Sequence, residues 1–278
     1  MIPLDENSIR SHINESEIKQ PLYVHLLSSI DSTNRFLKEE PSNEGITICC
    51  AETQTQGRGR FGRAWHSPFG ENIYFSARWR VQCELSALSG LSLVVSLTVL
   101  ETLNELGLAD NLSIKWPNDI LWHEKKLSGC LIELFTPTKT KKDVIIGIGI
   151  NVNSSHTQDS DSMINRPWCS LFDITMRLYD RNLIIGRLIT HLNRHMHNLL
   201  SYGFAYFLPK WQLVDGLKGQ LISVSQPSGV ISGVAQGIDD AGQLIIVDAD
   251  GDTHVLSSGE TSIVGASGAR PPEHYRHS

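Results

Sequence analysis

Apolar residues fall into short runs separated by polar turns over the first 150 residues. Residues 23–27 form one such run, and residues 45–52 (GITICCAE) form a continuous β-branched run that is typical of a strand covered on both faces. Apolar and polar residues alternate over 72–79, which predicts another strand. The same pattern predicts further strands at 112–116, 125–135 and 143–152.

Longer runs with helical spacing follow. Residues 85–106 predict a helix that ends at Gly107, a residue type that commonly follows the last helical turn. Ser, Thr, Glu and Asn interrupt this run, so it predicts a buried helix and not a membrane span. Residues 171–200 predict one short and one longer helix, and residues 204–211 predict a third.

The pattern changes at residue 218. Short alternating runs separated by glycine turns occupy 219–226, 229–238, 242–249 and 253–258, and they predict a small, partly open β barrel. The last residues are polar and rich in Gly, Pro and His, which predicts a disordered tail. We therefore expect a large domain over 1–216, a small domain over 217–265 and a tail over 266–278.

The composition is that of an ordinary soluble protein with a sizeable core. The chain has 278 residues, of which 40% are hydrophobic, and a net charge of -6, which argues against a broad nucleic-acid-binding surface. Its five cysteines show no CxxC pair, as expected for reduced thiols in the cytoplasm. The N-terminus lacks the basic and apolar segments of a secretory signal.

One basic segment stands out in this acidic chain: residues 54–68, QTQGRGRFGRAWHSP, between two predicted strands. Glycine lets the backbone bring amide groups against an anion, and arginine offers a planar fork of donors for phosphate or carboxylate oxygens. The segment predicts an anion site, with a solvated basic turn as the alternative. It is neither a Walker loop nor a dinucleotide fingerprint. Its interleaved residues are Gly57, Arg58, Gly59, Arg60, Gly62 and Arg63.

Polar residues near the predicted strands have two interpretations each. Asp31, Ser32 and Thr33 either cap a helix or face a pocket, where their hydroxyls hydrogen-bond a polar ring. Lys126 is either a surface lysine with a buried stem or a ligand-binding cation. Glycines inside the last two strands of the large domain indicate close approach by a ligand or another backbone: Gly129, Gly147 and Gly149.

The segment KWPND puts Lys115, Asn118 and Asp119 around one tight bend. It is either a favourable turn or a site for a phosphate and its Mg²⁺, which one or two carboxylates often hold together with substrate phosphates. His191 and His195 have a spacing that can hold zinc, but no glutamate follows His191 as in a metalloprotease. We therefore expect no metal at the histidines.

Taken together, these segments resemble a known family. DSTN, QTQGRGRFGRAW, SPFGENIYFS, KWPND, KKLSGCLIE and GIGINV occur in this order between residues 31 and 153. With them the chain resembles bacterial biotin protein ligases, and the segment from GQLISV to GETSI resembles the family's small barrel more loosely. The resemblance implies an α+β fold of the class II synthetase type, with a mixed sheet flanked by helices and an SH3-like C-terminal domain. It also implies that ATP activates biotin and that the biotinyl group passes to a lysine of a biotin carboxyl carrier protein.

The resemblance also implies roles for individual residues, and 1–216 becomes the catalytic domain. The biotin-binding residues would be Ser32, Thr33, Asn34, Gln54, Gly57, Arg58, Gly59, Arg60, Lys126 and Gly129. The ATP-binding residues would be Arg58, Arg60, Trp65, Lys115, Asn118, Asp119 and Asn151. Arg60, Lys126 and Asp119 would be catalytic, with Mg²⁺ near Asp119. Their chemistry agrees, because guanidinium groups and an ammonium screen the repulsion between a carboxylate and an α-phosphate.

Three departures from the family pattern matter. Bifunctional members carry an N-terminal winged-helix DNA-binding domain, whereas residues 1–22 alone precede the first strand here, so we expect a monofunctional enzyme without a nucleic-acid or membrane partner. Phe61 stands where the loop is often basic, and GETSIV lacks the basic residue that commonly follows the Gly-Glu pair. A homodimer remains open. The alternatives are a lipoate-type protein ligase and a non-catalytic biotin-binding regulator.

Overall fold

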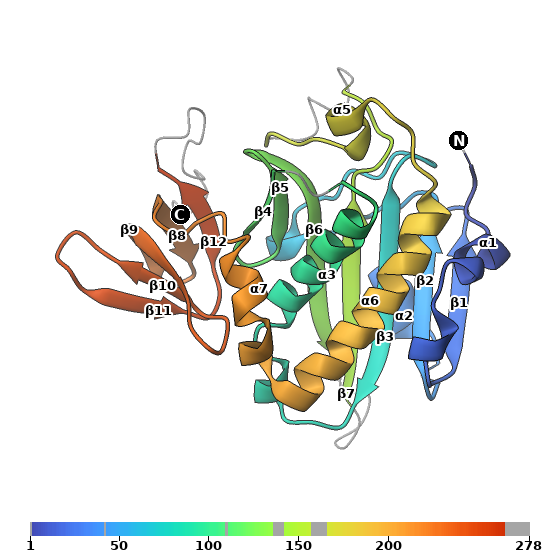
Figure 1. Cartoon of the computed structure of the whole chain (residues 1–278), viewed down its shortest axis with the longest axis horizontal. Coiled ribbons are helices and arrows are strands. Elements are labelled where there is room, and N and C mark those ends of the chain that lie inside the picture. The colour runs from blue at the N-terminus through green and yellow to red at the C-terminus, as the bar shows by residue number, and fades with distance from the viewer. Residues whose placement is uncertain (1, 42, 109–110, 136–141, 157–165, 265–278) are drawn as a thin grey trace, which may run out of the picture.

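The computed structural model describes residues 2–41, 43–108, 111–135, 142–156 and 166–264. The predicted tail at 266–278 lies outside these residues. Within them, one large mixed sheet forms the centre of the molecule (Figure 1). Its strands are β1 (Leu22–Leu27), β2 (Ile46–Ala51), β3 (Ile73–Val81), β4 (Leu112–Lys115), β5 (Asp119–Trp122), β6 (Lys125–Phe135) and β7 (Lys142–Ile150).

The strand order is β1-β2-β3-β7-β6-β5-β4. β1 and β2 are parallel, and the other neighbouring strands of this sheet are antiparallel. Each strand lies within two residues of a run that the sequence predicts, except that Asp119 and the residues after it form β5 as a strand of its own. The mixed sheet and the α+β class are therefore confirmed.

Helices cover both faces of this sheet. α2 (Thr33–Glu39) packs against β2, β3 and β7, while α3 (Leu91–Glu105) and α6 (Arg181–Tyr202) lie together on the opposite face in Figure 1. Every residue of β2 is buried as a result, as its continuous β-branched run predicts. The shorter elements that precede the second sheet are α1 (Glu6–Ser11), η1 (Glu15–Glu17), η2 (Arg60–Gly62), η3 (Leu85–Leu88), α5 (Leu171–Thr175), η4 (Phe204–Phe207) and α7 (Leu208–Gln212).

The prediction of one continuous helix over 85–106 is wrong. Gly90 has φ +72°, in the left-handed region, and it separates η3 from α3. A Cβ at Gly90 would lie 2.4 Å from the ring of Phe204, so packing between distant segments fixes this break. The predicted end is correct, because Gly107 also has φ +72° and the amide of Leu108 donates to the carbonyl of Leu103.

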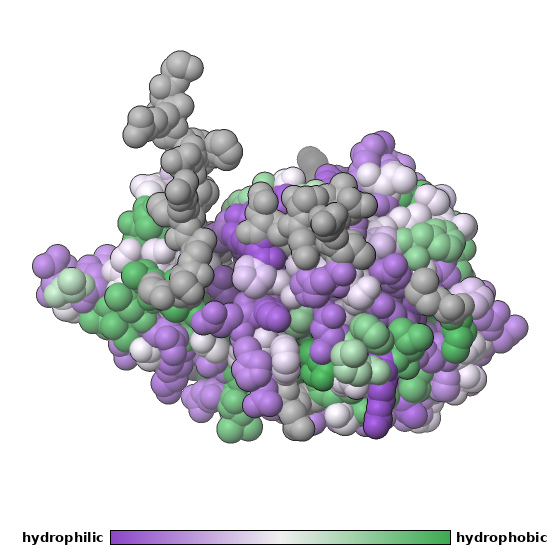
Figure 2. Space-filling model, turned by 90° about the horizontal axis from the view of Figure 1, so that it is seen from above, coloured by the Kyte–Doolittle hydropathy of each residue, from purple (hydrophilic) through white to green (hydrophobic). Residues whose placement is uncertain are grey.

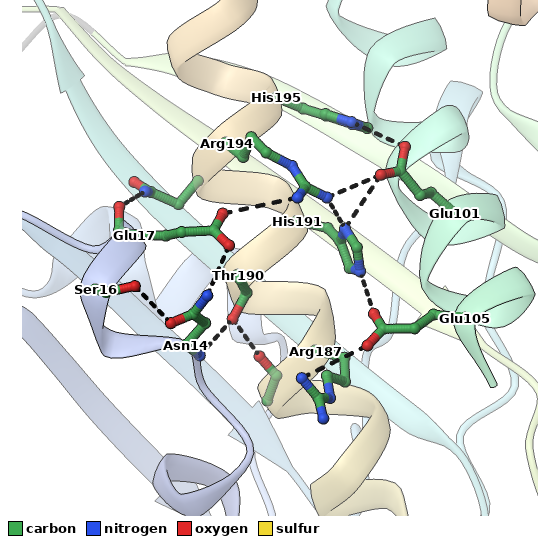
Figure 3. Close-up of polar contacts among 12 residues, drawn as sticks. Asn14, Ser16, Glu17, Glu101, Glu105, Arg187, Thr190, His191, Arg194 and His195 are labelled. Carbon is green, nitrogen blue, oxygen red and sulfur yellow. Dashed lines mark hydrogen bonds and ion pairs between the residues drawn. The ribbon is translucent and has the colours of Figure 1, made fainter.

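α3 is a core helix. By length and composition alone, Leu85–Glu105 is long and apolar enough to cross a membrane. However, 56% of its most apolar 18-residue stretch is buried inside the protein. Its strongest helix contact is with α6, where His191 and His195 face Glu101 (Figure 3). His195 Nε2 lies 3.1 Å from a Glu101 carboxylate oxygen, and Arg194 donates to Glu101 at 2.8 Å. The two histidines thus take part in polar contacts with Glu101 between the two helices.

A second sheet follows at the C-terminus, as the sequence predicts. It is antiparallel and ordered β11-β10-β9-β8-β12. Its outer side exposes apolar side chains such as Val230, Val234 and Val255, and Figure 2 shows apolar surface at the same end of the molecule. The strands are β8 (Leu221–Gln226), β9 (Gly229–Ile238), β10 (Leu244–Val247), β11 (Thr253–Leu256) and β12 (Glu260–Ile263).

Hydrogen bonds join this sheet to the turn between β4 and β5. The Trp116 indole donates to the carbonyl of Gly242 at 3.0 Å, and Thr261 Oγ1 donates to the carbonyl of Trp116 at 2.8 Å. Trp116 is almost fully buried. The C-terminal sheet is therefore held against the KWPND turn, and β12 reaches the polar residues of that turn.

Candidate functional site

A cavity of about 820 Å³ lies where the arginine loop, the KWPND turn, β6, β7 and β12 meet. Each site residue predicted from the sequence lines this cavity, although the residues come from segments more than a hundred positions apart. They are Ser32, Thr33, Asn34, Gln54, Gly57, Arg58, Gly59, Arg60, Trp65, Lys115, Asn118, Asp119, Lys126, Gly129 and Asn151.

The arginine loop is folded into a small hairpin. The Gly59 amide donates to the carbonyl of Arg63 at 2.7 Å, and the Trp65 amide donates to the carbonyl of Gly57 at 2.8 Å. A Cβ at Gly57 would lie 2.7 Å from the Trp65 carbonyl oxygen, so this crossing requires glycine. At the tip, Phe61 is exposed, and the Arg60 guanidinium lies 4.9 Å from the centre of its ring. The loop is therefore a hydrogen-bonded hairpin and not an extended basic turn.

Arg60 is directed toward the KWPND turn. Its guanidinium donates to Asn118 Oδ1 and to the carbonyl of Gly259, both at 3.2 Å. Burial lowers the pKa of Arg60, yet an arginine stays protonated at neutral pH. Arg58, by contrast, is exposed at the edge of the cavity. The Arg60 guanidinium is thus partly buried in the cavity wall, whereas Arg58 lies at its exposed edge.

Two lysines add positive charge beside this turn. Lys126 Nζ lies 2.6 Å from Asp119 Oδ1 and 5.4 Å from the centre of the Trp65 ring. A Cβ at Gly129 would lie 2.9 Å from Lys126 Nζ, so the glycine leaves room for this ion pair. Burial lowers the pKa of Lys115 to about 8. A half-buried cation in the cavity wall is suited to an anionic ligand.

Uncharged polar groups occupy the other end of the cavity. Ser32 is the N-cap of α2, but its hydroxyl makes no capping hydrogen bond. Gln54 Oε1 accepts from the Thr33 amide at 2.9 Å. Asn34 uses both ends of its side-chain amide within the protein, and the Asn151 amide donates to the carbonyl of Cys169 at 3.1 Å. Ser32, Thr33 and Gln54 are therefore the groups most available to a polar ring, whereas Asn34 acts on its neighbours.

Comparison with known proteins agrees with this arrangement. The model of the biotin/lipoate A/B protein ligase family matches residues 26–151, and the model of the biotin protein ligase C-terminal domain matches residues 219–264. Over 244 residues, the chain is 35% identical to the bifunctional ligase/repressor BirA of Escherichia coli. This match covers 87% of this chain and 74% of that protein. The chain belongs to the biotin protein ligase family.

Other members of the family support the match over nearly the whole length. The chain is 30% identical to the biotin–[acetyl-CoA-carboxylase] ligase of Mycobacterium tuberculosis, over 93% of this chain and 95% of that protein. Among solved structures, the biotin protein ligase of Aquifex aeolicus in complex with biotin and ATP is similar, with a TM-score of 0.73 and 32% identity. That match covers 86% of this chain and 97% of the other.

Sequence patterns did not identify two polar residues of the cavity wall, Arg166 and Glu260. The Glu260 carboxylate on β12 contacts the guanidinium groups of both Arg63 and Arg166. Burial lowers the pKa of each arginine. Arg166 lies about a hundred residues from the loop along the chain, so neither spacing nor periodicity connects the two. The Gly-Glu pair at the start of β12 was the available signal, because the resemblance includes it.

Two tryptophans of the cavity wall have buried indole N–H groups. Trp65 and Trp168 line the cavity, and their Nε1 atoms have no hydrogen-bond partner among the described residues. Buried donors normally have a partner. These two groups are therefore candidates to donate to an acceptor on a ligand, which gives Trp65 a second reason to belong to the site.

Proposed function

We propose that this chain activates biotin with ATP to give biotinyl-5′-AMP and pyrophosphate, and then transfers the biotinyl group to one lysine of a biotin carboxyl carrier protein. The observation that carries the proposal is one cavity with two different ends. Ser32, Thr33 and Gln54 form a neutral polar end suited to a ureido ring, while Arg60 and Lys126 form a cationic end suited to a carboxylate and a phosphate. The relatives with biotin in their names support the same conclusion.

In the first step, a carboxylate oxygen of biotin forms a bond to the α-phosphorus of ATP, and the bond to the β-phosphate oxygen breaks. Both reactants are anions, so their approach must be offset by positive charge in a site with little water. Arg60, Arg58 and Lys126 supply that charge. The Arg60 guanidinium is already fixed by Asn118, so less orientation has to occur when the ligands bind.

Mg²⁺ would enter with the nucleotide. Asp119 contributes one carboxylate at the cationic end, and a single carboxylate with substrate phosphates is a common Mg²⁺ environment. The described residues contain no group of three metal-binding side chains, so the phosphates would supply most of the ligands. Lys115, with its pKa lowered to about 8 by burial, would attract the same phosphates below that pH.

In the second step, the neutral amine of the acceptor lysine attacks the carbonyl carbon of the mixed anhydride, and AMP leaves. The amine must lose a proton, and Asp119 is the candidate acceptor because it lies beside Lys126 in the cavity. We place the reaction in the cytoplasm, with the carrier domain as the protein partner. The homodimer stays a prediction that analytical ultracentrifugation would test.

Transfer of labelled biotin tests the proposal. Incubation with ATP, biotin and an acceptor carrier domain should label one lysine, and Arg60→Ala should slow labelling by about 100-fold or more. Arg177→Ala, at an exposed arginine that does not line the cavity, is the matched control and should label at the wild-type rate. Equal labelling by Arg60→Ala and wild type would remove Arg60 from the site.

A second candidate, a lipoate-type protein ligase, follows from the matching family model, which covers biotin and lipoate ligases together. A lipoate ring has no N–H or carbonyl group for the neutral polar end. Biotin should therefore compete with lipoate far better than the reverse. A non-catalytic regulator would bind biotin without releasing pyrophosphate, so a pyrophosphate assay separates it from both ligases.

A further inference from the structure

Glu133 is a carboxylate behind the neutral polar end of the cavity, and it lies outside the cavity wall itself. Its Oε2 accepts from Asn34 Nδ2 at 2.7 Å. An ionised carboxylate can only accept hydrogen bonds, whereas an amide has a donor end and an acceptor end. Glu133, together with the Leu131 carbonyl at 3.5 Å from the same Nδ2, therefore directs this end of the Asn34 amide toward β6 and leaves Oδ1 pointing the other way.

Asn34 can lie between two strands because β7 carries a glycine beneath it. A Cβ at Gly147 would lie 2.3 Å from Asn34 Oδ1. In the sheet, Gly147 pairs with Ser76 of β3 on one side and with Leu131 of β6 on the other. The amide therefore spans β7 from Glu133, on β6, to Ser76, on β3.

Ser76 receives the orientation that Glu133 imposes. Its Oγ is fully buried and lies 2.6 Å from Asn34 Oδ1 and 2.7 Å from Thr33 Oγ1. A hydroxyl has one hydrogen, and Asn34 Oδ1 can only accept, so Ser76 donates to Asn34. The Thr33 hydroxyl then donates either to Ser76 Oγ or to Gln54 Oε1, which lies 3.1 Å away. In both cases its hydrogen stays within the protein.

The consequence for a ligand is a fixed pattern of donors and acceptors. Thr33 Oγ1 offers a lone pair to the cavity and accepts from an N–H group. Gln54 Oε1 is held by the Thr33 amide, so Nε2 is the end that is free to donate to a carbonyl. A ring that carries an N–H beside a carbonyl matches both groups, and a dithiolane ring matches neither.

We propose that Glu133 is a positioning residue that favours a cyclic urea, because through Asn34 it directs the Ser76 hydroxyl away from Thr33 and leaves the Thr33 hydroxyl to donate within the protein. This inference rests on the proposed function, since the cyclic urea is the ring of biotin. Glu133 touches no substrate. Its effect is transmitted through the hydrogen bonds that join it to Asn34, Asn34 to Ser76, and Ser76 to Thr33.

An anchoring role for α2 is the competing explanation, and Glu133→Gln separates the two. Glutamine has the same size and still hydrogen-bonds the Asn34 amide, but it can present either an oxygen or an NH₂ group. The contact with the Leu131 carbonyl, 3.5 Å from Asn34 Nδ2, then has to hold the direction of the Asn34 amide without a fixed carboxylate acceptor, so the direction at Ser76 is held less firmly. If Glu133 only anchors α2, this substitution should leave biotin affinity unchanged. If Glu133 fixes the hydrogen-bond direction, biotin affinity should fall.

Calorimetric titration with biotin and steady-state adenylation kinetics provide the test. We expect Glu133→Gln to raise the Kd and the KM for biotin about tenfold, with a much smaller change in kcat and in the KM for ATP. Glu39→Gln, at an exposed glutamate of α2, is the control and should match wild type. Wild-type biotin affinity in folded Glu133→Gln would overturn the inference.

A reciprocal change makes the test specific for direction. In the double variant Glu133→Gln with Asn34→Asp, the carboxylate at position 34 accepts from both the glutamine and Ser76, so the direction at Ser76 is restored. Biotin affinity should recover most of the loss. A further decrease in affinity would contradict the inference. If the single variant is poorly folded, the affinity of the double variant decides the matter in its place.

A biotin analogue methylated on its ureido nitrogens gives a second measure. Its affinity relative to biotin should be lower in wild type than in Glu133→Gln, because only a fixed acceptor at Thr33 penalises the missing N–H; an equal ratio would refute the inference. The proposed function fails separately. Wild type that binds biotin without releasing pyrophosphate from ATP would contradict adenylation, while the same titrations would still decide the role of Glu133.

Discussion

The substitution Gly149→Ala tests how closely the cavity is built around Trp65. Gly149 lies on β7, which is hydrogen-bonded on both sides in the sheet, and the Trp65 ring packs on it. A Cβ at this position would lie 2.4 Å from two carbons of the indole ring. Carbon atoms in contact lie about 3.5–4.0 Å apart, so one of the two must move by about 1 Å or more.

The ring should move, because it belongs to the loop while Gly149 belongs to a central strand. The Trp65 ring also faces Lys126 Nζ. Displacement of the ring would therefore change the surroundings of the Lys126 ammonium as well as the position of the indole. A misplacement of about 1 Å at a reacting centre reduces rates about 100-fold. The free energy of unfolding should fall by only about 1 kcal/mol, the low end for overpacking, since a loop yields more easily than a core.

Pyrophosphate release at saturating biotin and ATP gives the rate, and urea denaturation gives the stability. Gly147→Ala is the matched comparison two residues away on β7, and its Cβ would meet Asn34 Oδ1 at 2.3 Å. It should weaken biotin binding more than nucleotide binding. Gly149→Ala with a rate within about threefold of wild type would show that the indole position is not critical.

Three further predictions concern charge. For Lys115, whose pKa burial lowers to about 8, kcat/KM for ATP should fall as pH rises through 8, and Lys115→Arg should abolish that fall; a fall in both proteins would place the titration elsewhere. Hydrogen bonds from His191 and His195 lower the pKa of Glu101, and the bond to Glu101 raises the pKa of His191. The contribution of Glu101 to the free energy of unfolding is present above the pKa that Glu101 has in the unfolded chain. The contribution of His191 is lost as pH rises through the raised pKa that His191 has in the folded protein. Urea denaturation should therefore show that Glu101→Gln lowers the free energy of unfolding by about 1–3 kcal/mol at pH 6 and by less at pH 9, and an equal loss at both would contradict the coupling. Arg181→Met should destabilise the protein by about 3–5 kcal/mol in the same assay, because it leaves Glu52 buried without the partner that lies 2.6 Å away; near-wild-type stability would mean that the pair contributes little.

Local patterns predict much of this fold. Continuous or alternating apolar runs give the strands of the large sheet, and the glycine at 107 gives the end of α3. The order of the strands does not follow from these runs, because pairing of β3 with β7 depends on contacts about seventy residues apart. Gly90 shows the same limit. Its left-handed conformation follows from the packing of Phe204, which no local window contains.

The candidate site divides in a similar way. Residues within motifs, such as Arg60 and Lys126, are predicted because each motif combines residue types with an evident affinity for anions. Glu260 and Glu133 are not, since each acts on a group brought close only by the fold. The assignment of Asn34 as a direct biotin contact remains a prediction, and its amide is occupied by Glu133 and Ser76.

Exchange of labelled pyrophosphate into ATP tests the central claim most directly, because it follows adenylate formation in reverse and needs no carrier protein. Wild type should catalyse exchange only when biotin is present, and Arg60→Ala should reduce the biotin-dependent rate about 100-fold or more. Exchange that proceeds equally without biotin, or at the wild-type rate in Arg60→Ala, would contradict a cavity in which the arginine loop joins the biotin carboxylate to the nucleotide.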